Sequence, residues 1–344
     1  MGGAGRRWPE AEAEATLEGG VRLVLEAQVP ELQGEDEVAG RGSEVEVDGR
    51  RLSLTNLDKV LYPEAGFTKG EVIDYYARIA PVLIPHLADR ALTVTRWPDG
   101  VEGKHFFEKR CPTHRPEWVR TEKVWAGNRA GEIEFCICDD RPTLTWLAQL
   151  AALELHPSLS LVADVERPTV LAFDLDPGPP ATIVECCRVA LMLRELFARL
   201  EVECFPKSSG SKGMQVYVPL NGELTYEATK PFARAVAQAL ESAHPELVVS
   251  RMTKDLRTGK VFVDWSQNTA SKTTIAAYSL RARPQPTVST PLLWEEVEKA
   301  DRDAEADLLV FESAAVLDRV QEHGDLFAPV LELKQTLPDQ LAQG

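Results

Sequence analysis

The sequence predicts one mixed domain of the α/β or α+β class, because segments with helical periodicity are interspersed with short β-branched strands. A capping box, Thr68 to Glu71, opens an amphipathic segment that runs to about His86. Two apolar strands, Thr169–Asp176 and Val261–Asp264, each end in acidic residues. No internal repeat or linker interrupts residues 44–335, so one large domain or two subdomains fit the length.

The N-terminal part differs in composition from the rest. Residues 1–42 are rich in Glu, Gly and Ala, and we expect a flexible acidic extension with one short strand or helix in its apolar patch VRLVLEAQV. Order is expected to begin at the alternating strand Glu44–Arg50, which ends in an Asp-Gly turn. We therefore place the domain at residues 43–335 and a short tail at residues 336–344.

The remaining elements follow from periodicity and from breaker residues. In chain order we expect a helix at Thr143–His156 ending before Pro157, the strand Thr169–Asp176, a helix at Thr182–Leu200, a strand into SSGSKG, the strand Met214–Pro219, a helix at Tyr226–Ala243 and the strand Val261–Asp264.

The net charge of −16 is unevenly distributed along the chain. The first 50 residues carry 5 basic and 12 acidic residues, and residues 291–344 carry 4 and 13, so residues 51–290 carry 29 of each. A neutral middle can still present a basic face, and a polyanion responds to the local field. The acidity therefore does not exclude DNA as a partner.

Cysteine usage and hydropathy indicate the compartment. Six cysteines lack framework spacing, which favours buried thiols in a reducing, cytoplasmic setting. A zinc site of Cys111, His114, Cys136 and Cys138 is the alternative, with atypical spacing. The start of the chain has no apolar run typical of a secretory signal, and no segment is long enough to cross a membrane, so we expect no membrane partner.

Three short strings together indicate an active site. FDLDP places Asp174 and Asp176 on one face of a strand, and KVFVDWSQN adds Asp264 at the end of another. Carboxylates this close repel each other unless a cation joins them, and an all-oxygen set suits Mg²⁺ or Mn²⁺. Between them, SSGSKG is typical of a loop that offers backbone N–H groups and one Lys to phosphates. The combination indicates phosphoryl or nucleotidyl transfer.

At these strings the chain resembles the polymerase domain of bacterial ligase D, in the archaeo-eukaryotic primase superfamily. The resemblance covers residues 45–335 and includes, in order, LTNLDKVLYPEAGFTKGEV, RWPDGVEGKHFFEK, LAALELH, FDLDPGP, SSGSKG, FVDWSQN, SKTTIA and YSLRAR. It implies an α+β fold of primase type, with mixed sheets flanked by helices and the active site in a central cleft. It also implies a template-dependent polymerase for DNA repair that favours ribonucleotides.

The resemblance assigns roles to residues in these strings. Asp174, Asp176 and Asp264 match the ligands of two Mn²⁺ or Mg²⁺ ions, and His156 matches an active-site histidine that the residues alone would class as structural. The residues matched to binding of the NTP or dNTP substrate are Ser209, Lys212, Arg257, Gln215 and Gln267.

The resemblance also implies a DNA-binding set. Phe106 and Phe107 match an aromatic pair that stacks on the template, although the residues alone favour ordinary core packing. Lys59 and Lys69 match lysines that bind the 5′-phosphate downstream of a gap, although the residues alone suggest solvated surface lysines. The further DNA contacts expected are Arg96, Lys109, Arg281 and Arg283.

Three departures from the family pattern refine the expectation. The usual Gly-Leu-His after the phosphate loop is Gly213-Met214-Gln215 here, and Gln215 can bond a phosphate but carries no charge. The stretch from His156 to Asp174 is short, and the chain carries no ligase or phosphoesterase domain. These features favour the stand-alone branch, which fills short gaps at the nucleoid with a separate ATP-dependent ligase such as ligase C.

Other functions remain open. An end-joining polymerase acting with Ku and a ligase uses the same residues. A metal-dependent phosphohydrolase would use the carboxylates but leaves the aromatic pair and the upstream lysines unexplained. A catalytically weak module that binds DNA gaps is suggested only by Gln215. The intact set of three Asp residues favours the polymerase.

Overall fold

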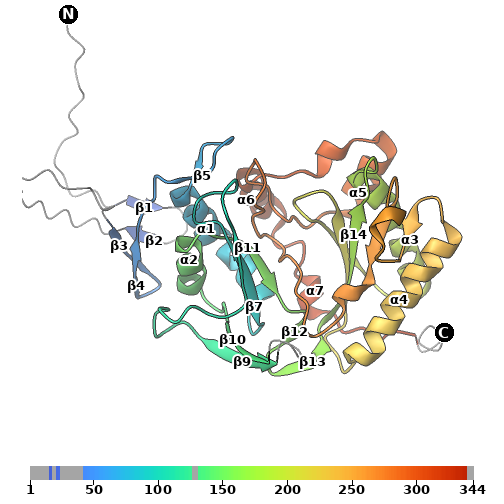
Figure 1. Cartoon of the computed structure of the whole chain (residues 1–344), viewed down its shortest axis with the longest axis horizontal. Helices are drawn as coiled ribbons and strands as arrows, with labels where there is room; N and C mark the ends of the chain where they lie inside the picture. Colours follow the sequence, from blue (N-terminus) through green and yellow to red (C-terminus); the bar gives the residue numbers. More distant parts are fainter. Residues whose placement is uncertain (1–14, 18–20, 24–41, 126–130, 339–344) are drawn as a thin grey trace, which may run out of the picture.

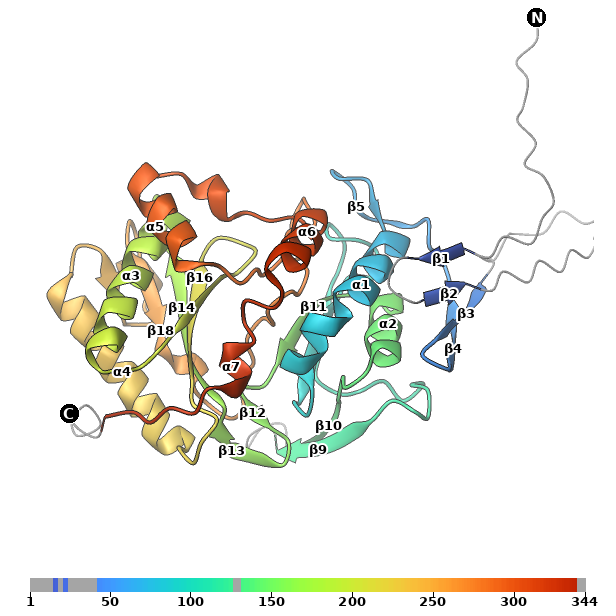
Figure 2. The ribbon, with the colours of Figure 1, turned by 180° about the vertical axis from the view of Figure 1, so that it is seen from behind.

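A computed structural model describes residues 15–17, 21–23, 42–125 and 131–338. Two main sheets lie side by side, each with its own helices, and α6 (Ser313–His323) and α7 (Pro329–Glu332) lie between them (Figures 1 and 2). Every named strand pair in the described part is antiparallel except β17–β18, so the fold is α+β, as expected.

The first sheet belongs to the N-terminal half. Its strands run in the order β11-β7-β10-β9, and β8 pairs with β7 beyond the end of β10. The elements of this half are β3 (Ser43–Val47), β4 (Arg50–Leu54), β5 (Val60–Tyr62), β6 (Phe67–Thr68), α1 (Lys69–Leu87), β7 (Leu92–Arg96), β8 (Phe106–Glu108), β9 (Thr121–Trp125), β10 (Glu132–Cys136), α2 (Arg141–Gln149) and β11 (Ala152–Pro157). The hairpin β12 (Ser160–Leu161)–β13 (Asp164–Pro168) follows.

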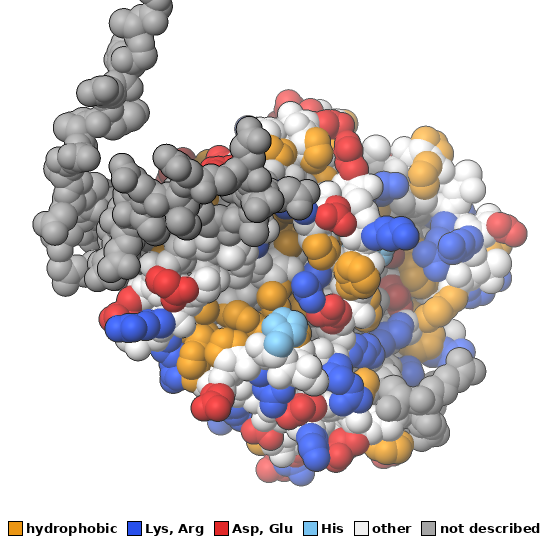
Figure 3. All heavy atoms as spheres, turned by 60° about the vertical axis from the view of Figure 1, so that its left-hand side comes forward, with side chains coloured by type: hydrophobic (Ala, Val, Ile, Leu, Met, Phe, Trp, Pro, Cys, Tyr) orange, Lys and Arg blue, Asp and Glu red, His pale blue; other side chains and the backbone are white. Residues whose placement is uncertain are grey.

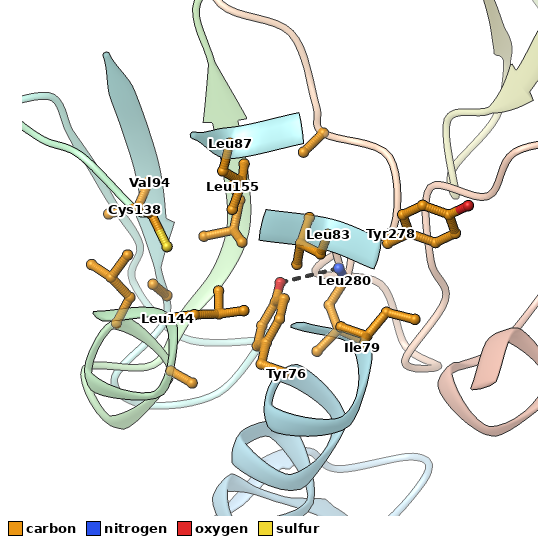
Figure 4. Packing of buried hydrophobic residues seen from close by; sticks show 14 of the residues in the cluster. Tyr76, Ile79, Leu83, Leu87, Val94, Cys138, Leu144, Leu155, Tyr278 and Leu280 are labelled. Carbon is orange, nitrogen blue, oxygen red and sulfur yellow. Dashed lines mark hydrogen bonds between the residues drawn. The ribbon is translucent and has the colours of Figure 1, made fainter. Parts of the chain in front are cut away.

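Helix α1 forms the centre of the first core (Figure 4). It begins after the N-cap Thr68, and the expected capping box with Glu71 is present. Tyr76 is fully buried, donates to the Leu153 carbonyl at 2.6 Å and accepts from the Leu280 amide at 3.1 Å. One tyrosine of α1 thus joins the first sheet to a segment 204 residues away in the chain.

The second sheet holds the acidic strands. Its order is β15-β16-β14-β18-β17, and it packs on α3 and α4. Its elements and their neighbours are β14 (Val170–Pro177), α3 (Ile183–Arg199), β15 (Phe205–Ser208), β16 (Met214–Pro219), α4 (Tyr226–Ala243), β17 (Val248–Val249), η1 (Lys254–Leu256), β18 (Val261–Asp264), η2 (Trp265–Gln267), α5 (Trp294–Asp303) and η3 (Ala306–Leu309).

Alternation along β14 separates a dry face from a polar one. Leu171, Phe173 and Leu175 are fully buried in the second core. Asp174 and Asp176 therefore leave the strand on the opposite face, as predicted. That face is turned away from the α3–α4 layer.

One predicted helix is wrong over its second half. The segment expected to be helical at 143–156 is α2 up to Gln149 and then strand β11. Ala151 adopts φ +56°, a left-handed conformation that ends the helix, and residues 152–157 pair with β7. His156 therefore lies on a strand of the first sheet, not at the end of a helix.

The cysteines differ partly from expectation. Cys111 and Cys136 form a disulfide, so the prediction of buried thiols is wrong for this pair, and neither sulfur is available as a zinc ligand. Cys138, Cys186, Cys187 and Cys204 are free and buried, as expected.

At the N-terminus, β1 (Ala15–Leu17) and β2 (Val21–Leu23) extend the β3–β4 hairpin. Of the two alternatives expected for the apolar patch, a short strand or a short helix, the structure has a strand, β2. The rest of the expected flexible extension, and tail residues 339–344, lie outside the described residues. Among the helices described, none is both long and apolar enough to span a bilayer.

Candidate active site

A single row of polar side chains crosses the second sheet. In the antiparallel register Lys207 lies opposite Gln215, Gln215 opposite Asp174, and Asp174 opposite Asp264. Directly opposed residues project from the same face of a sheet. Asp176, two positions beyond Asp174, shares this face. The structure thus brings the three predicted carboxylates and Gln215 together.

Crowding changes the protonation of the two carboxylates on β14. Burial raises the pKa of Asp174 to about 7, and the charge of Asp176 adds to this. Burial and the charge of Asp264 also raise the pKa of Asp176. Like charges held this close are a set of hard donors that suits a divalent cation.

Asp264 is held by the turn that follows it. Its Oδ1 accepts from the Ser266 amide at 2.8 Å and the Ser266 hydroxyl at 2.6 Å, and its Oδ2 accepts from Gln267 Nε2 at 3.0 Å. Gln267, predicted to bind nucleotide, thus orients an acidic residue in this structure.

Sequence reasoning missed Asn268, which follows the same turn. Its side-chain amide pairs with both the N–H and the C=O of Ala172 and so extends the hydrogen-bond ladder between β14 and β18 beyond the end of β18.

As these side chains lie, no three His, Cys, Asp or Glu residues of the described chain are close enough to hold one metal ion together. The oxygens of Asp264 face Ser266 and Gln267, and Asp174 accepts from Gln215 Nε2 at 3.1 Å. The other amide atom, Gln215 Oε1, is buried without a hydrogen-bond partner. An unsatisfied acceptor beside crowded carboxylates fits a bound cation or its water.

Lys207 is a member of the row that the sequence did not reveal. It is fully buried, its ammonium donates to Ser289 Oγ at 2.7 Å, and it lies over the ring of Tyr217. Burial lowers its pKa to about 7, and the Asp174 charge opposes this effect. The sequence offered only a weak signal for this residue, namely a lysine directly before SSGSKG in a segment expected to be a strand.

The loop between β15 and β16 requires glycine at two positions. Gly210 has φ +64°, and a Cβ there would lie 2.5 Å from the Val288 carbonyl carbon. A Cβ on Gly213 would lie 2.1 Å from the Leu175 carbonyl oxygen. Ser209 Oγ accepts from the amides of Ser211 and Gly213, both at 3.2 Å, which makes the loop compact. Lys212 is exposed beyond this turn.

Residues 281–290 hold the same loop from behind. The carbonyls of Ser208, Ser209 and Gly210 accept from Ser289, Arg281 and Thr287 respectively, and Arg283 donates to Ser211 Oγ. These hydrogen bonds fix four consecutive residues of the loop, 208–211, to the segment 281–290. Arg281 and Arg283, expected to contact phosphate or template, therefore bind the loop itself in this structure.

Arg257 borders the acidic face. Its guanidinium carbon lies 3.7 Å from the centre of the Phe262 ring, and Phe262 is opposite Asp176 in the register. Nη2 donates to the Met252 carbonyl at 2.8 Å, whereas Nε is buried without a partner. A guanidinium with an unused donor beside carboxylates is suited to a phosphate oxygen.

His156 lies on the first sheet. On β11, Glu154 is opposite Thr95 and His156 is opposite Thr93, while Phe107 on β8 is also opposite Thr95. The Phe107 and His156 rings lie 6.1 Å apart, edge to face. His156 Nε2 lies 3.2 Å from Glu154 Oε2, and Glu154 also accepts from Arg281 Nε at 2.9 Å. Arg281 thereby connects His156 to the nucleotide loop.

Phe106 and Phe107 are 52% and 57% exposed, so the interpretation as ordinary core is wrong. Consecutive strand residues project to opposite faces, which places Phe107 with His156 and Phe106 with Arg96. Arg96 donates to both carboxylate oxygens of Glu108, at 2.9 and 3.1 Å. Lys109 follows β8 and is half-buried.

Lys59 and Lys69 form a basic group with Arg96. Burial lowers the pKa of Lys69 to about 8, and the charges of Lys59 and Arg96 add to this. Lys69 Nζ donates to the Thr55 carbonyl at 2.9 Å and the residue is only 7% exposed, so it is not a solvated surface lysine. Lys59 is paired with Asp99 at 3.0 Å. Repelling ammonium groups held together are suited to an anion such as phosphate.

Charge on the wider surface is mixed. On the face drawn in Figure 3, Lys and Arg side chains alternate with Asp and Glu, and hydrophobic side chains are exposed between them. DNA binding would then depend on local basic groups.

Comparisons with known proteins give a consistent result. The family model described as LigD, primase-polymerase domain, matches residues 68–327. The multifunctional non-homologous end joining protein LigD of Mycolicibacterium smegmatis is 45% identical over 293 residues, 85% of this chain and 37% of the relative. The bifunctional LigD of Bacillus subtilis is 33% identical over 275 residues, 80% of this chain and 43% of the relative. The chain thus spans less than half the length of these relatives.

A solved structure is also similar. The polymerase domain from Mycobacterium tuberculosis ligase D, in complex with DNA, matches with a TM-score of 0.75 and 41% sequence identity. The match covers 83% of this chain and 99% of that domain.

Proposed function

Because the chain belongs to the LigD primase-polymerase family, we propose that it is a DNA-directed nucleotidyltransferase that fills short gaps from a primer 3′-hydroxyl. We place the catalytic domain at residues 43–335. The observation that carries the proposal is the row Gln215–Asp174–Asp264 beside a glycine-dependent loop. Carboxylates and a phosphate-binding loop on one face are the equipment for transferring a nucleotidyl group.

Asp174, Asp176 and Asp264 are proposed to hold two Mn²⁺ or Mg²⁺ ions. For this, Asp264 exchanges part of its bonding to Ser266 and Gln267, and Asp174 part of its bonding to Gln215. Bound ions supply the charge that lowers the pKa of the primer hydroxyl and neutralises the triphosphate. Burial and the charge of Asp176 raise the pKa of Asp174, and a bound cation would offset both effects, which favours this exchange.

The nucleotide contacts follow from the loop and from Arg257. Lys212 and the Ser209 hydroxyl are proposed to bind the triphosphate of an NTP or dNTP, with Arg257 donating its free Nε to the same phosphates. Ser209 can donate its proton to phosphate while its oxygen accepts from Ser211 and Gly213. A preference for ribonucleotides is part of the proposal.

The two exposed phenylalanines of strand β8 are the proposed contacts to DNA. Phe107 is proposed to stack on the template beside His156, and Phe106 to contact DNA on the side of Arg96. Lys59 and Lys69 are proposed to bind a downstream 5′-phosphate. Gapped or primer-template DNA at the nucleoid is then the substrate, with a separate ATP-dependent ligase of the ligase C kind to seal the product.

End joining is the second candidate, because the relatives are named non-homologous end joining proteins. In that case Ku and a ligase are the partners. The two candidates share the catalytic residues and differ in the DNA they prefer. Nucleotide incorporation on a duplex with a short gap, compared with incorporation on two DNA ends with complementary overhangs, distinguishes the two candidates.

The test is primer extension on a gapped duplex with and without the downstream 5′-phosphate, with rNTPs or dNTPs and Mn²⁺ or Mg²⁺. We expect phosphate-stimulated, rNTP-favoured filling. Lys59→Ala with Lys69→Ala should abolish the stimulation, whereas Lys299→Ala, an exposed lysine of α5, should retain it. Extension that ignores the phosphate contradicts the gap pocket, and no extension under any condition contradicts the polymerase.

A further inference from the structure

Glu154 is a buried carboxylate with donors on both of its oxygens. Its side chain is 11% exposed. Oε1 accepts from Arg281 Nε at 2.9 Å and from the Ala282 amide at 3.2 Å, and Oε2 lies 3.2 Å from His156 Nε2. It stands on β11 of the first sheet, while Arg281 belongs to the segment that holds the nucleotide loop.

The charge of Glu154 determines which nitrogen of His156 carries a hydrogen. Burial alone would raise the pKa of Glu154, but the His156 hydrogen bond and the Arg281 charge lower it to about 2. An ionised carboxylate can only accept hydrogen bonds. Nε2 of His156 must therefore carry a hydrogen in this contact, and in the neutral ring Nδ1 is then the nitrogen without one.

The other oxygen of Glu154 acts through Arg281. Arg281 uses Nε for Glu154 and Nη1 for the Ser209 carbonyl. Because a guanidinium is planar and rigid, fixing Nε also fixes the direction of Nη1. Ser209 in turn accepts from Ser211 and Gly213 and so determines the shape of the loop.

We propose that Glu154 is a positioning residue that orients the nucleotide site from two sides. One oxygen holds His156 in the Nε2–H form with its Nδ1 free. The other holds Arg281, and through it the carbonyl of Ser209. This role rests on the proposed function for the identity of the nucleotide, whereas the hydrogen bonds to His156 and Arg281 do not depend on it.

Glu154→Gln separates this role from simple packing. An amide whose oxygen stays on Arg281 and Ala282 turns its NH₂ group towards His156 and can only donate there. His156 must then accept at Nε2 and carry its hydrogen on Nδ1. In Arg281→Lys, Glu154 keeps its charge, so the histidine form should stay unchanged while the loop loses its anchor.

The first readout is ¹⁵N NMR of the histidine side chains in the full chain, with the signal of His156 identified by its loss in His156→Asn. We expect Nε2–H in the wild type and in Arg281→Lys, and Nδ1–H in Glu154→Gln. The matched control Glu134→Gln removes a carboxylate of the same sheet, paired with Arg115 at 3.0 Å, and should leave His156 unchanged. A wild-type Nδ1–H form, or no change in Glu154→Gln, overturns the proposal.

The second readout is nucleotide incorporation on gapped DNA. Glu154→Gln replaces the charged acceptor of the Arg281 hydrogen bond by a neutral one, and Arg281→Lys removes the guanidinium that donates to the Ser209 carbonyl. Loss of a charge-assisted hydrogen bond, or of its charge, corresponds to about tenfold in binding. We expect the nucleotide KM to rise by about this factor in Glu154→Gln and Arg281→Lys, with DNA affinity unchanged and Glu134→Gln unaffected. An unchanged KM in both variants overturns the role of Glu154. A wild type that incorporates nothing instead contradicts the proposed function, and the NMR result still decides the contacts of Glu154.

Discussion

Asp174 on β14 and Asp264 on β18 lie directly opposite each other in the antiparallel register of the second sheet. Two acidic residues in one such pair destabilise a sheet unless something compensates their charge. The Gln215 amide and the Ser266–Gln267 turn supply hydrogen bonds but no positive charge. The pair is therefore suited to the cations proposed above, and its repulsion gives it no evident role in stability.

The pKa of Lys69 predicts how recognition of the 5′-phosphate depends on pH. Burial, Lys59 and Arg96 lower this pKa to about 8, so the free protein loses the ammonium charge as pH rises from 7 to 9. Phosphate binding must then take up a proton, and the preference for a 5′-phosphorylated gap should fall over this range. Dissociation constants for gaps with 5′-phosphate and 5′-hydroxyl, measured from pH 6.5 to 9.5, check this.

Arginine stays charged throughout that range, so Lys69→Arg should make the preference independent of pH. Lys59→Arg, the matched change at the more exposed lysine, should keep the pH dependence. The lowered pKa of Lys69 also makes folding depend on pH, in the direction opposite to phosphate recognition. Between pH 8 and 10.5 the unfolded chain binds the proton that the folded protein has lost, so the free energy of unfolding rises with pH. A flat wild-type preference would refute the assignment of Lys69.

The two phenylalanines of β8 should have different effects. Phe107 lies on the face of His156, and Phe106 on the face of Arg96. Stacking on a base is worth roughly 1–3 kcal/mol by alanine substitution. Phe107→Ala should weaken binding of single-stranded template by about tenfold, whereas Phe106→Ala should affect only DNA with a downstream strand. Fluorescence anisotropy with both DNA forms measures this, and equal losses on both would contradict it.

Asn268 should contribute strongly to stability. It is fully buried, and its amide makes hydrogen bonds to both main-chain groups of Ala172 and to the Trp265 carbonyl. Asn268→Ala leaves these groups unpaired and should lower the unfolding free energy by about 2–4 kcal/mol in urea titrations. The neighbouring half-buried Thr269, which loses one hydrogen bond on change to Ala, should cost about 1 kcal/mol or less. Similar losses for both would contradict the ladder role.

The disulfide predicts a response to reductant. Cys111 and Cys136 close a loop with a sequence separation of 25, which stabilises by about 3.5 kcal/mol in the chain-entropy model. Reduction should lower the urea midpoint of the wild type and of Cys204→Ser, but not that of Cys136→Ser. Thiol titration of the unfolded, unreduced protein should find the four free cysteines. Six thiols there would show that the bond is absent.

Much of the fold follows from local sequence signals. Helix α4 (Tyr226–Ala243), strand β16 and strand β18 have the predicted bounds, because breakers and β-branched runs define their ends. Strand β11 was mistaken for helix because its residues Ala152–Leu155 continue the apolar pattern of α2. Only the pairing with β7 and the left-handed Ala151 settle it as a strand.

The site was predictable where its residues are adjacent in sequence. Asp174 and Asp176 share a strand face by their spacing alone. Lys207, Glu154 and Asn268 were not predictable, because their roles depend on partners that are distant in sequence: Ser289, Arg281 and Ala172. The two roles given to Arg281 illustrate the same point, since a cation near a nucleotide site can bind either the ligand or the loop that holds it.

The most direct test is a single-turnover nucleotide incorporation assay with Asp264→Asn on gapped DNA with saturating Mn²⁺. Incorporation is expected to fall to background while the dissociation constant for the same DNA is unchanged. Asp303→Asn, at the end of α5 and not in the polar row of the second sheet, should behave as wild type. Incorporation by Asp264→Asn at the wild-type rate would contradict the claim that the facing carboxylates of β14 and β18 carry out the chemistry.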